Sequence, residues 1–395
     1  MKILHVNNQI RLGGAETVIR QLLHGFPNST LAVAEGKIYP QNVLPLYPRF
    51  LSRITHSRFH QQIEWIAPRA RWTDCAFRRI SDSSFDLVHL HNFHGQYASI
   101  ESLAHLCKYK PVIWTLHALW AVTGGCDHPR SCLRYLHSCG DCPQLGRWPL
   151  GDIDNTQDQL SRKVHHLGQL PLHIVAPSKW LAHIVKQSPV GRRWHVHHIP
   201  NAVDSQFVCS LPPRVTHPLT ILIVNRNFAD EQKGWPIARD ALNQIAPTAR
   251  LLLVGQNSDH AAAEVPGWAC ESLGYLSDPA VLANAHSHSD IFLFASPAEN
   301  FPCVVLEAMA AGLCVVATPT GGVVEQIIDG VSGLLAKDIS APSLAKVLSV
   351  ALIRPDLRAR LGSYAQSVDF SERSFIVRHT QLYLELLNSP IRKND

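Results

Sequence analysis

Short apolar runs alternate, in both halves of the chain, with longer segments in which apolar residues recur at helical spacing. The short runs indicate strands buried on both faces, and the longer segments indicate helices. The predicted strands span residues 3–7, 30–34, 87–91, 112–117, 173–177, 195–199, 219–225, 250–255, 290–296 and 314–318. The predicted helices begin near residues 15, 97, 156 and 179, then span 234–245, 278–286, 302–311, 341–353 and 371–388. This alternation predicts an α/β fold built on parallel sheets.

Residues 199–218 interrupt the alternation. They include the consecutive prolines Pro212 and Pro213, many polar residues and no apolar periodicity, which is typical of a linker. We therefore expect two Rossmann-like, doubly wound domains facing a central cleft. The first is predicted over residues 1–203 and the second over residues 204–395.

The length of 395 residues also favours two domains over one. Hydrophobic residues make up 46% of the chain and charged residues 17%, which excludes a disordered or fibrous protein. No apolar stretch is long enough for a membrane span, and Asn7, Asn8 and Arg11 come too early for a signal peptide. We therefore expect a cytoplasmic protein with mostly reduced cysteines.

The net charge of +5 is unevenly distributed. Residues 1–205 carry 22 Lys and Arg against 13 Asp and Glu, a balance of +9, whereas residues 206–395 carry 14 against 18, a balance of −4. Segment 49–79 combines seven arginines with five aromatic residues. This composition suits contact with an anionic membrane, or a solvated helix whose aromatic side chains pack inward. No recognised nucleic-acid motif accompanies it, so we expect no nucleic-acid partner.

Two glycines, Gly13 and Gly14, follow the first predicted strand and open a helix. Glycines let backbone amides approach an anion, and a helix N-terminus favours negative charge, so this turn is a candidate phosphate contact. An ordinary tight turn explains it equally well. The GxGxxG fingerprint is absent, which argues against a dinucleotide enzyme.

Glu299 and Glu307 frame a predicted helix of the second domain. Pro302 suits the first helical turn and Gly312 the end, so the two carboxylates lie at most about 12 Å apart. They suit the two ends of a nucleotide sugar, with Glu299 on sugar hydroxyls and Glu307 on the ribose diol. Alternatively, Glu299 is a turn residue favoured by the helix dipole and Glu307 is a surface charge. A surface charge fits poorly, because Glu307 is the only charge between Phe301 and Gly312.

A second glycine-rich turn, Thr320-Gly321-Gly322, follows the predicted strand 314–318. Ligands of open α/β sheets bind at the carboxyl ends of the strands, so these backbone amides are candidates for holding a diphosphate. Glu325 has the simpler interpretation of a helix-start residue.

Four cysteines, Cys126, Cys132, Cys139 and Cys142, are separated by five, six and two residues. Four thiols can hold a tetrahedral structural zinc ion. The spacing is irregular for a zinc ribbon, so disulfides or free thiols in a stabilised loop stay open as alternatives. Nothing in the sequence suggests a catalytic metal.

The order of these motifs is similar to that of a known family. Residues 274–333 resemble the C-terminal core of retaining GT-B glycosyltransferases of family 4, with the Glu-x7-Glu pair, the TGG turn and Asp329-Gly330 in sequence. The resemblance extends over nearly the whole chain through the segments GGAE (13–16), DLVHLHN (86–92), VAPSKWLA (175–182) and IPNAVD (199–204).

Residues 112–145 resemble one branch of that family, found in exopolysaccharide and colanic-acid biosynthesis. The branch carries the cysteine-rich insertion, here at about 118–150. It usually reads His-Asp-Met-Trp where this chain has His117-Ala118-Leu119-Trp120.

The resemblance implies roles for individual residues. His117 would lie beside the donor sugar, and Lys233 and Arg226 would lie on the donor phosphates, although Arg226 precedes Lys233 by more residues than is usual in the family. Helix 371–388 would pack back on the first domain. The implied donor site also includes Gly13, Gly14, Glu299, Asn300, Phe301, Pro302, Glu307, Thr320, Gly321 and Gly322.

The resemblance also implies an activity. A hexose would move with retention from a nucleotide-diphosphate sugar, UDP favoured over GDP, to a glycan or lipid-linked oligosaccharide in surface polysaccharide biosynthesis. No catalytic cofactor would be needed, and the protein would work peripherally on the inner face of the plasma membrane. Two other functions stay open: a degenerate nucleotide-sugar-binding scaffold, which Ala118 permits, and a sugar phosphorylase on the same fold.

Overall fold

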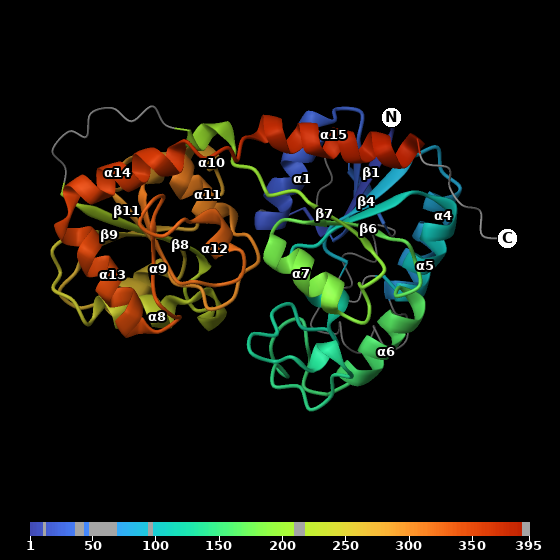
Figure 1. Ribbon diagram of the computed structural model, residues 1–395, viewed down its shortest axis with the longest axis horizontal. Helices are drawn as coiled ribbons and strands as arrows, with labels where there is room; N and C mark the ends of the chain where they lie inside the picture. Colours follow the sequence, from blue (N-terminus) through green and yellow to red (C-terminus); the bar gives the residue numbers. More distant parts are fainter. Residues whose placement is uncertain (11–12, 36–42, 47–68, 94–97, 209–217, 389–395) are drawn as a thin grey trace. The chain divides into compact units, whose positions relative to one another are not determined.

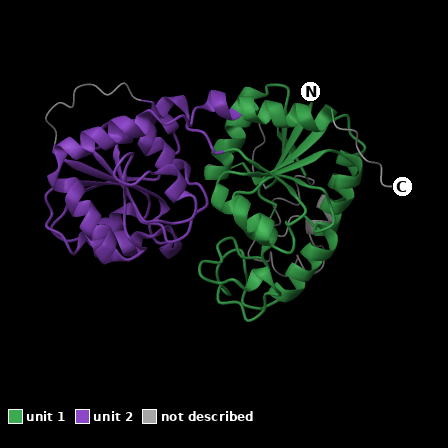
Figure 2. Ribbon diagram, viewed as in Figure 1, with its two compact units in different colours: residues 1–199, 376–395 green, residues 200–375 purple. Residues whose placement is uncertain are grey.

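The computed structural model describes residues 1–395 except for 11–12, 36–42, 47–68, 94–97, 209–217 and 389–395. The chain divides into two compact units (Figure 2). The N-terminal unit comprises residues 1–199 and 376–395, and the C-terminal unit comprises residues 200–375. Each unit is a Rossmann-like α/β fold around one parallel sheet, which confirms the predicted fold class.

The sheet of the N-terminal unit has seven parallel strands in the order β3-β2-β1-β4-β5-β6-β7. β4 and β5 are buried at every position, because a parallel sheet is covered on both faces (Figure 1). The strands are β1 (Ile3–Gln9), β2 (Thr30–Glu35), β3 (Val43–Pro45), β4 (Leu87–Leu90), β5 (Val112–Thr115), β6 (His173–Ala176) and β7 (His195–His198). The helices are α1 (Gly14–Gly25), α4 (Arg69–Ser81), α5 (Ile100–Tyr109), α6 (Thr156–His166) and α7 (Lys179–Gln187).

The last helix, α15 (Glu372–Asn388), belongs to the N-terminal unit from Ile376 onward. It runs beside α1 in Figure 1. Tyr383 of α15 is completely buried, and its ring centroid lies 5.0 Å from that of Phe26, just beyond α1. The far end of the chain therefore supplies part of the core of the first unit.

The sheet of the C-terminal unit has six strands in the order β10-β9-β8-β11-β12-β13. Its central strands are continuous apolar runs, buried at every position of β11 and β12. The strands are β8 (Thr220–Asn227), β9 (Arg250–Gln256), β10 (Ala269–Gly274), β11 (Ile291–Phe294), β12 (Cys314–Ala317) and β13 (Leu334–Leu335). The helices are α8 (Trp235–Leu242), α9 (Ser258–Ala263), α10 (Pro279–Ser287), α11 (Cys303–Ala310), α12 (Val323–Gln326), α13 (Ala341–Ile353) and α14 (Pro355–Gln366).

The hydrophobic pattern predicted the edge strand β7 but missed the other three edge strands, β3, β10 and β13. In β10, exposed and half-buried positions alternate, so the strand carries no continuous apolar run. β5 also ends at Thr115, two residues earlier than predicted, so His117 lies in the loop that follows the strand.

Candidate active site

The glycine turn after β1 starts α1 at Gly14, with Gly13 as its N-cap. A glycine cap leaves the helix without a capping side chain, and nothing would lie within 4 Å of a β-carbon on Gly14. The Glu16 carboxylate in the same turn accepts a hydrogen bond of 3.2 Å from Nδ2 of Asn7. The space beside Gly14 is therefore open, whereas the Glu16 carboxylate lies close to Gly13, 2.6 Å from where a β-carbon would stand, and itself places negative charge at this helix N-terminus.

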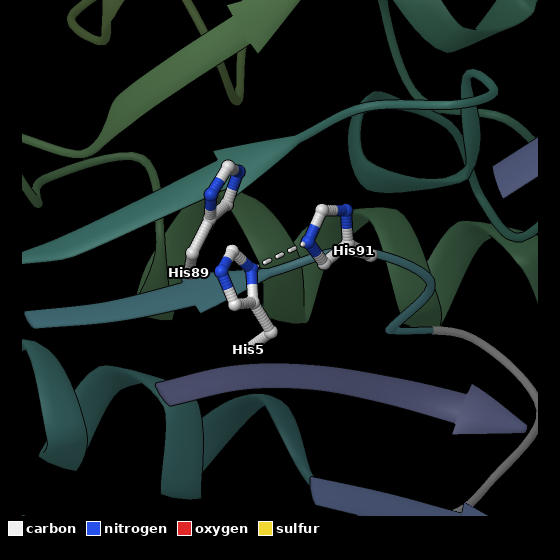
Figure 3. A group of neighbouring side chains, drawn as sticks. All are labelled: His5, His89 and His91. Atoms are coloured by element: carbon white, nitrogen blue, oxygen red, sulfur yellow. Dashed lines mark hydrogen bonds between the residues drawn. The ribbon is translucent and has the colours of Figure 1, made fainter. Parts of the chain in front are cut away.

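Imidazole side chains from β1 and from β4 and its end meet in the N-terminal unit (Figure 3), and His117 from the loop after β5 joins them. Nδ1 of His5, in β1, lies 3.2 Å from Nε2 of His91, the residue after β4. Nδ1 of His91 lies 3.3 Å from Nε2 of His117. The predicted site residue His117 is therefore the half-buried end of a hydrogen-bonded chain that leads into the core.

His89, in β4, completes this histidine cluster. Its Nδ1 lies 2.7 Å from the Tyr383 hydroxyl, and its Nε2 lies 2.7 Å from Oγ1 of Thr115. Burial lowers the pKa of His5 to about 3, and it lowers the pKa values of His89 and His91 well below their ordinary value. At neutral pH these rings are neutral, and each offers one hydrogen-bond donor and one acceptor.

His5, His89 and His91 form the one group among the described residues whose three ligating atoms all lie within 4.8 Å of one another. A metal ion would require a lone pair from each ring. Both ring nitrogens of His89 already bond to Thr115 and Tyr383. We therefore assign this cluster to hydrogen bonding in the core.

In the C-terminal unit, two predicted site residues form an ion pair. Nζ of Lys233 donates a hydrogen bond of 2.8 Å to Oε1 of Glu299. The side chains are 35% and 18% exposed, so the pair is accessible to a ligand. Attraction by Glu299 raises the pKa of Lys233, which stays charged throughout the physiological range.

A glycine makes this pair possible. Gly234 has φ +81°, and a β-carbon there would overlap the carbonyl of Ala295, at the end of β11. The bare backbone therefore lets the turn of Lys233 lie directly against the strand end that leads to Glu299. Arg226, exposed in β8, is close enough for its charge to oppose that of Lys233.

The TGG turn packs on the same segment. Gly321 has φ +49°, and a β-carbon on it would overlap the carbonyl oxygen of Glu299. The amide of Gly322 donates a 2.7 Å hydrogen bond to the Asn300 carbonyl, and the Thr320 amide donates a 3.0 Å bond to the Thr318 carbonyl. Among the described residues, the Gly321 amide is therefore the donor of this turn that has no acceptor.

Asn300, Phe301 and Pro302 connect Glu299 to α11 and are almost completely buried. The ring centroid of Phe301 lies 5.9 Å from that of Phe370, and the Phe301 carbonyl accepts a 2.9 Å bond from Nδ2 of Asn201. These contacts hold the backbone between Glu299 and α11 in place.

Glu307 follows one turn into α11 and is only 8% exposed. The rest of that helix is apolar and mostly buried. A carboxylate in such surroundings is costly unless it serves a partner or a ligand.

The four cysteines of the insertion line one cavity of about 10 Å³, together with Tyr135. All four are free thiols. The structure thus gathers the cysteines that the sequence singled out.

Most of the basic segment 49–79 lies outside the described residues. In its described part, Phe77 is buried against Phe93 and the arginines Arg78 and Arg79 are exposed. Among the described helices, none combines the length and the hydrophobicity that crossing a bilayer requires.

Two family models match the chain. "Glycosyltransferase Family 4" matches residues 12–207, and "Glycosyl transferases group 1" matches residues 214–368. The chain carries both glycosyltransferase domains. With its two Rossmann-like units, the fold is GT-B.

The chain is also similar to individual proteins, among them a glycosyl transferase and solved structures of the same fold. This glycosyltransferase chain is 26% identical to the Escherichia coli glycosyl transferase WcaC, named for colanic acid biosynthesis, over 251 residues. The match spans 59% of this chain and 59% of WcaC, less than two thirds of that relative. Sucrose-phosphate synthase from Thermosynechococcus elongatus aligns over 98% of both chains at 17% identity with a TM-score of 0.73. Anabaena Alr3699/HepE in complex with UDP-glucose aligns at 17% identity and a TM-score of 0.67, over 98% of this chain and 100% of that one.

Sequence reasoning did not foresee the polar core behind His117. Its members His5, His89 and Tyr383 are scattered along the chain, and the only local signal is the alternation His89-Leu90-His91, which places two imidazoles on one face of a strand.

Proposed function

We propose that this protein is a retaining glycosyltransferase that moves a hexose-type sugar from a UDP-sugar to a glycan or lipid-linked oligosaccharide in surface polysaccharide biosynthesis. The observation that supports this most is the Lys233–Glu299 ion pair, which lies against the Thr320–Gly322 turn at the start of the segment leading to Glu307.

The charges suit a leaving diphosphate. Bond cleavage leaves negative charge on the phosphate oxygens, and two fixed cations, Lys233 and Arg226, would stabilise it. The Gly321 amide would add one hydrogen-bond donor. A carboxylate accepts several hydrogen bonds, so Glu299 can bind sugar hydroxyls while it holds Lys233. Glu307 would bind the ribose diol.

The proposed chemistry needs no general base from the chain. The acceptor hydroxyl attacks the anomeric carbon on the face that the phosphate leaves, the phosphate takes the hydroxyl proton, and the configuration is retained. His117, held by His91, would contribute a hydrogen bond to the sugar. We propose that the transfer proceeds without a metal ion, so a chelator should leave the initial rate unchanged.

Two observations support a glycan or lipid-linked acceptor. The name of WcaC points to a cell-surface polysaccharide, and the +9 balance of residues 1–205 suits an acceptor held at an anionic membrane.

A thermal-shift panel with UDP, GDP, ADP, UDP-sugars and inorganic phosphate tests the donor. A ligand at a hundredfold excess over its Kd stabilises the folded protein by about 2.7 kcal/mol. We expect UDP and a UDP-sugar to raise the Tm, Glu307→Ala to abolish the shift, and Glu271→Ala, at an exposed carboxylate of edge strand β10, to preserve it. A shift with phosphate alone would instead support a phosphorylase.

The stereochemistry is tested separately. With a UDP-α-sugar and an acceptor, the NMR coupling constant of the new anomeric proton should report an α-linkage. A β-linkage would contradict retention. Donor binding without turnover on any acceptor tried would favour the degenerate scaffold.

A further inference from the structure

The cysteine-rich insertion between β5 and α6 has little regular structure to hold it. It contains only two short 3₁₀ turns, η1 (Trp120–Val122) and η2 (Arg134–Leu136). Several of its residues, including Arg130, Cys139 and Asp141, have positive φ values, which are strained for residues other than glycine. A long loop with so little secondary structure needs another source of stability.

The four thiols occupy the centre of this loop. Cys126, Cys132, Cys139 and Cys142 line a single cavity of about 10 Å³, which has room for one small ion or one water molecule. The cysteines come from different turns of the loop, so a single ion bound to all four would join those turns.

Hydrogen bonds hold the backbone beside two of these cysteines. The Thr123 hydroxyl donates a bond of 2.7 Å to the carbonyl of Cys126, and the amide of Cys142 donates a bond of 2.8 Å to Oδ2 of Asp154. Outer contacts of this kind, which fix the residues that carry the ligands, accompany metal sites.

The loop also contains a buried cation. Lys163 of α6 is completely buried; its Nζ donates bonds of 2.6 and 2.9 Å to the carbonyls of Trp120 and Thr123, at the start of the insertion. It is close enough to Cys126 and Cys139 to interact with their charges. Four thiolates around a divalent ion carry a net charge of −2, which a buried ammonium would partly balance.

We propose that Cys126, Cys132, Cys139 and Cys142 bind one zinc ion that stabilises the insertion. The ion would replace the four thiol protons, so that Zn²⁺ and four thiols give one tetrathiolate complex and four protons. Tetrahedral Zn–S bonds of about 2.3 Å place the sulfurs about 3.8 Å apart. The four sulfurs are not yet gathered within 4.8 Å of one another, so binding would contract the cavity.

The test is the metal content of the full-length protein, purified under reducing conditions without a metal-affinity step. Elemental analysis should find about one zinc per chain, which Cys132→Ser and Cys142→Ser should each reduce severalfold. Cys270→Ser, at a half-buried cysteine of the C-terminal unit, is the matched control and should keep the zinc.

A second measurement does not depend on the folding of the variants. Replacing the metal with Co²⁺ in the wild-type protein should produce the intense visible absorption of tetrahedral thiolate coordination, and a strong chelator should lower the Tm. Zinc-free protein in which thiol titration finds the four cysteines oxidised would overturn the proposal in favour of disulfides. Zinc that persists in both serine variants would overturn it in favour of a site elsewhere in the chain. Neither result depends on glycosyl transfer.

Discussion

The two units carry their candidate functional residues at corresponding positions of the fold, but the residue types differ. In the N-terminal unit, imidazoles from β1, β4 and the loop after β5 bond to one another, and burial keeps those of His5, His89 and His91 uncharged. In the C-terminal unit, the close approach of Gly234 to the Ala295 carbonyl brings Lys233 to Glu299, and both side chains remain partly exposed. Both sets lie at or near the carboxyl ends of parallel strands, where open α/β sheets bind ligands.

The surroundings of each set of residues determine how it can act on a ligand. Burial keeps His5, His89 and His91 neutral, so they can orient a neighbour but cannot supply charge. Lys233 and Glu299 keep their charges because each stabilises the other and water still reaches both. The Lys233–Glu299 pair is therefore suited to a charged group and the histidine cluster to a neutral one.

Removing the cation should have the largest effect. Lys233→Ala leaves Glu299 without its partner and the leaving phosphate with one cation fewer, so we expect kcat/KM to fall about 10²- to 10³-fold. Lys337→Ala, at an exposed lysine of the same unit, is the control. Transfer rates within twofold of wild type for Lys233→Ala would remove this residue from the mechanism.

A side chain at Gly321 should disrupt the packing of the Thr320–Gly322 turn against Glu299. Gly321→Ala adds a β-carbon that overlaps the Glu299 carbonyl, at a positive φ, and should cost about 3 kcal/mol of unfolding free energy. Gly330→Ala has a positive φ but open space around it, so it isolates the backbone strain, at about 1 kcal/mol. Chemical denaturation measures both, and equal losses would show that the close approach to Glu299 does not matter.

Acid should destabilise the N-terminal unit first. Its described part contains at least five histidines whose pKa values are lowered chiefly by burial, whereas His286 is the one such histidine among the described residues of the C-terminal unit; the five are His5, His89, His91, His173 and His197. Because the unfolded chain binds these protons more readily, stability is complete above about pH 6.5 and falls with pH toward about 3 for His5. One such histidine costs about 2 kcal/mol at pH 5.

Hydrogen exchange at pH 7.5 and pH 5 measures this difference peptide by peptide. Protection should fall more in β1 and β4 than in β11 and β12. The same loss of protection in both units would show that the buried histidines do not set the acid response.

Deleting one hydroxyl should have the smallest effect. Tyr383→Phe keeps the ring but removes its bond to His89, so we expect a loss of about 1 kcal/mol from the N-terminal unit. Tyr364→Phe, at an exposed tyrosine of α14, should change stability little. Calorimetry of the two variants compares them directly, and a Tyr383→Phe protein as stable as wild type would show that the bond is not needed.

The same contrast explains what the sequence could predict. The continuous apolar runs of β8 and β11 can be recognised as strands from the sequence alone. β10 and β13 lack such a run, and they are strands because they pair with a neighbouring strand. Glu299, Glu307 and the TGG turn lie within 24 residues of one another and follow familiar spacings, so the sequence alone is enough to select them as candidates.

Contacts between distant residues were harder to foresee. That Lys233 touches Glu299 depends on how closely Gly234 approaches Ala295, which only the folded backbone shows. His89 of the histidine cluster bonds to Tyr383, which lies 294 positions later in the chain, and no spacing rule connects the two residues.

The position of α15 also has a consequence for the order in which the protein is made. During synthesis, residues 200–375 emerge from the ribosome as one uninterrupted unit, while the first unit still waits for Tyr383 to cover Phe26 and bond to His89. The unit that begins first is therefore the one that is finished last, and until then Phe26 and His89 lack the contacts that Tyr383 supplies.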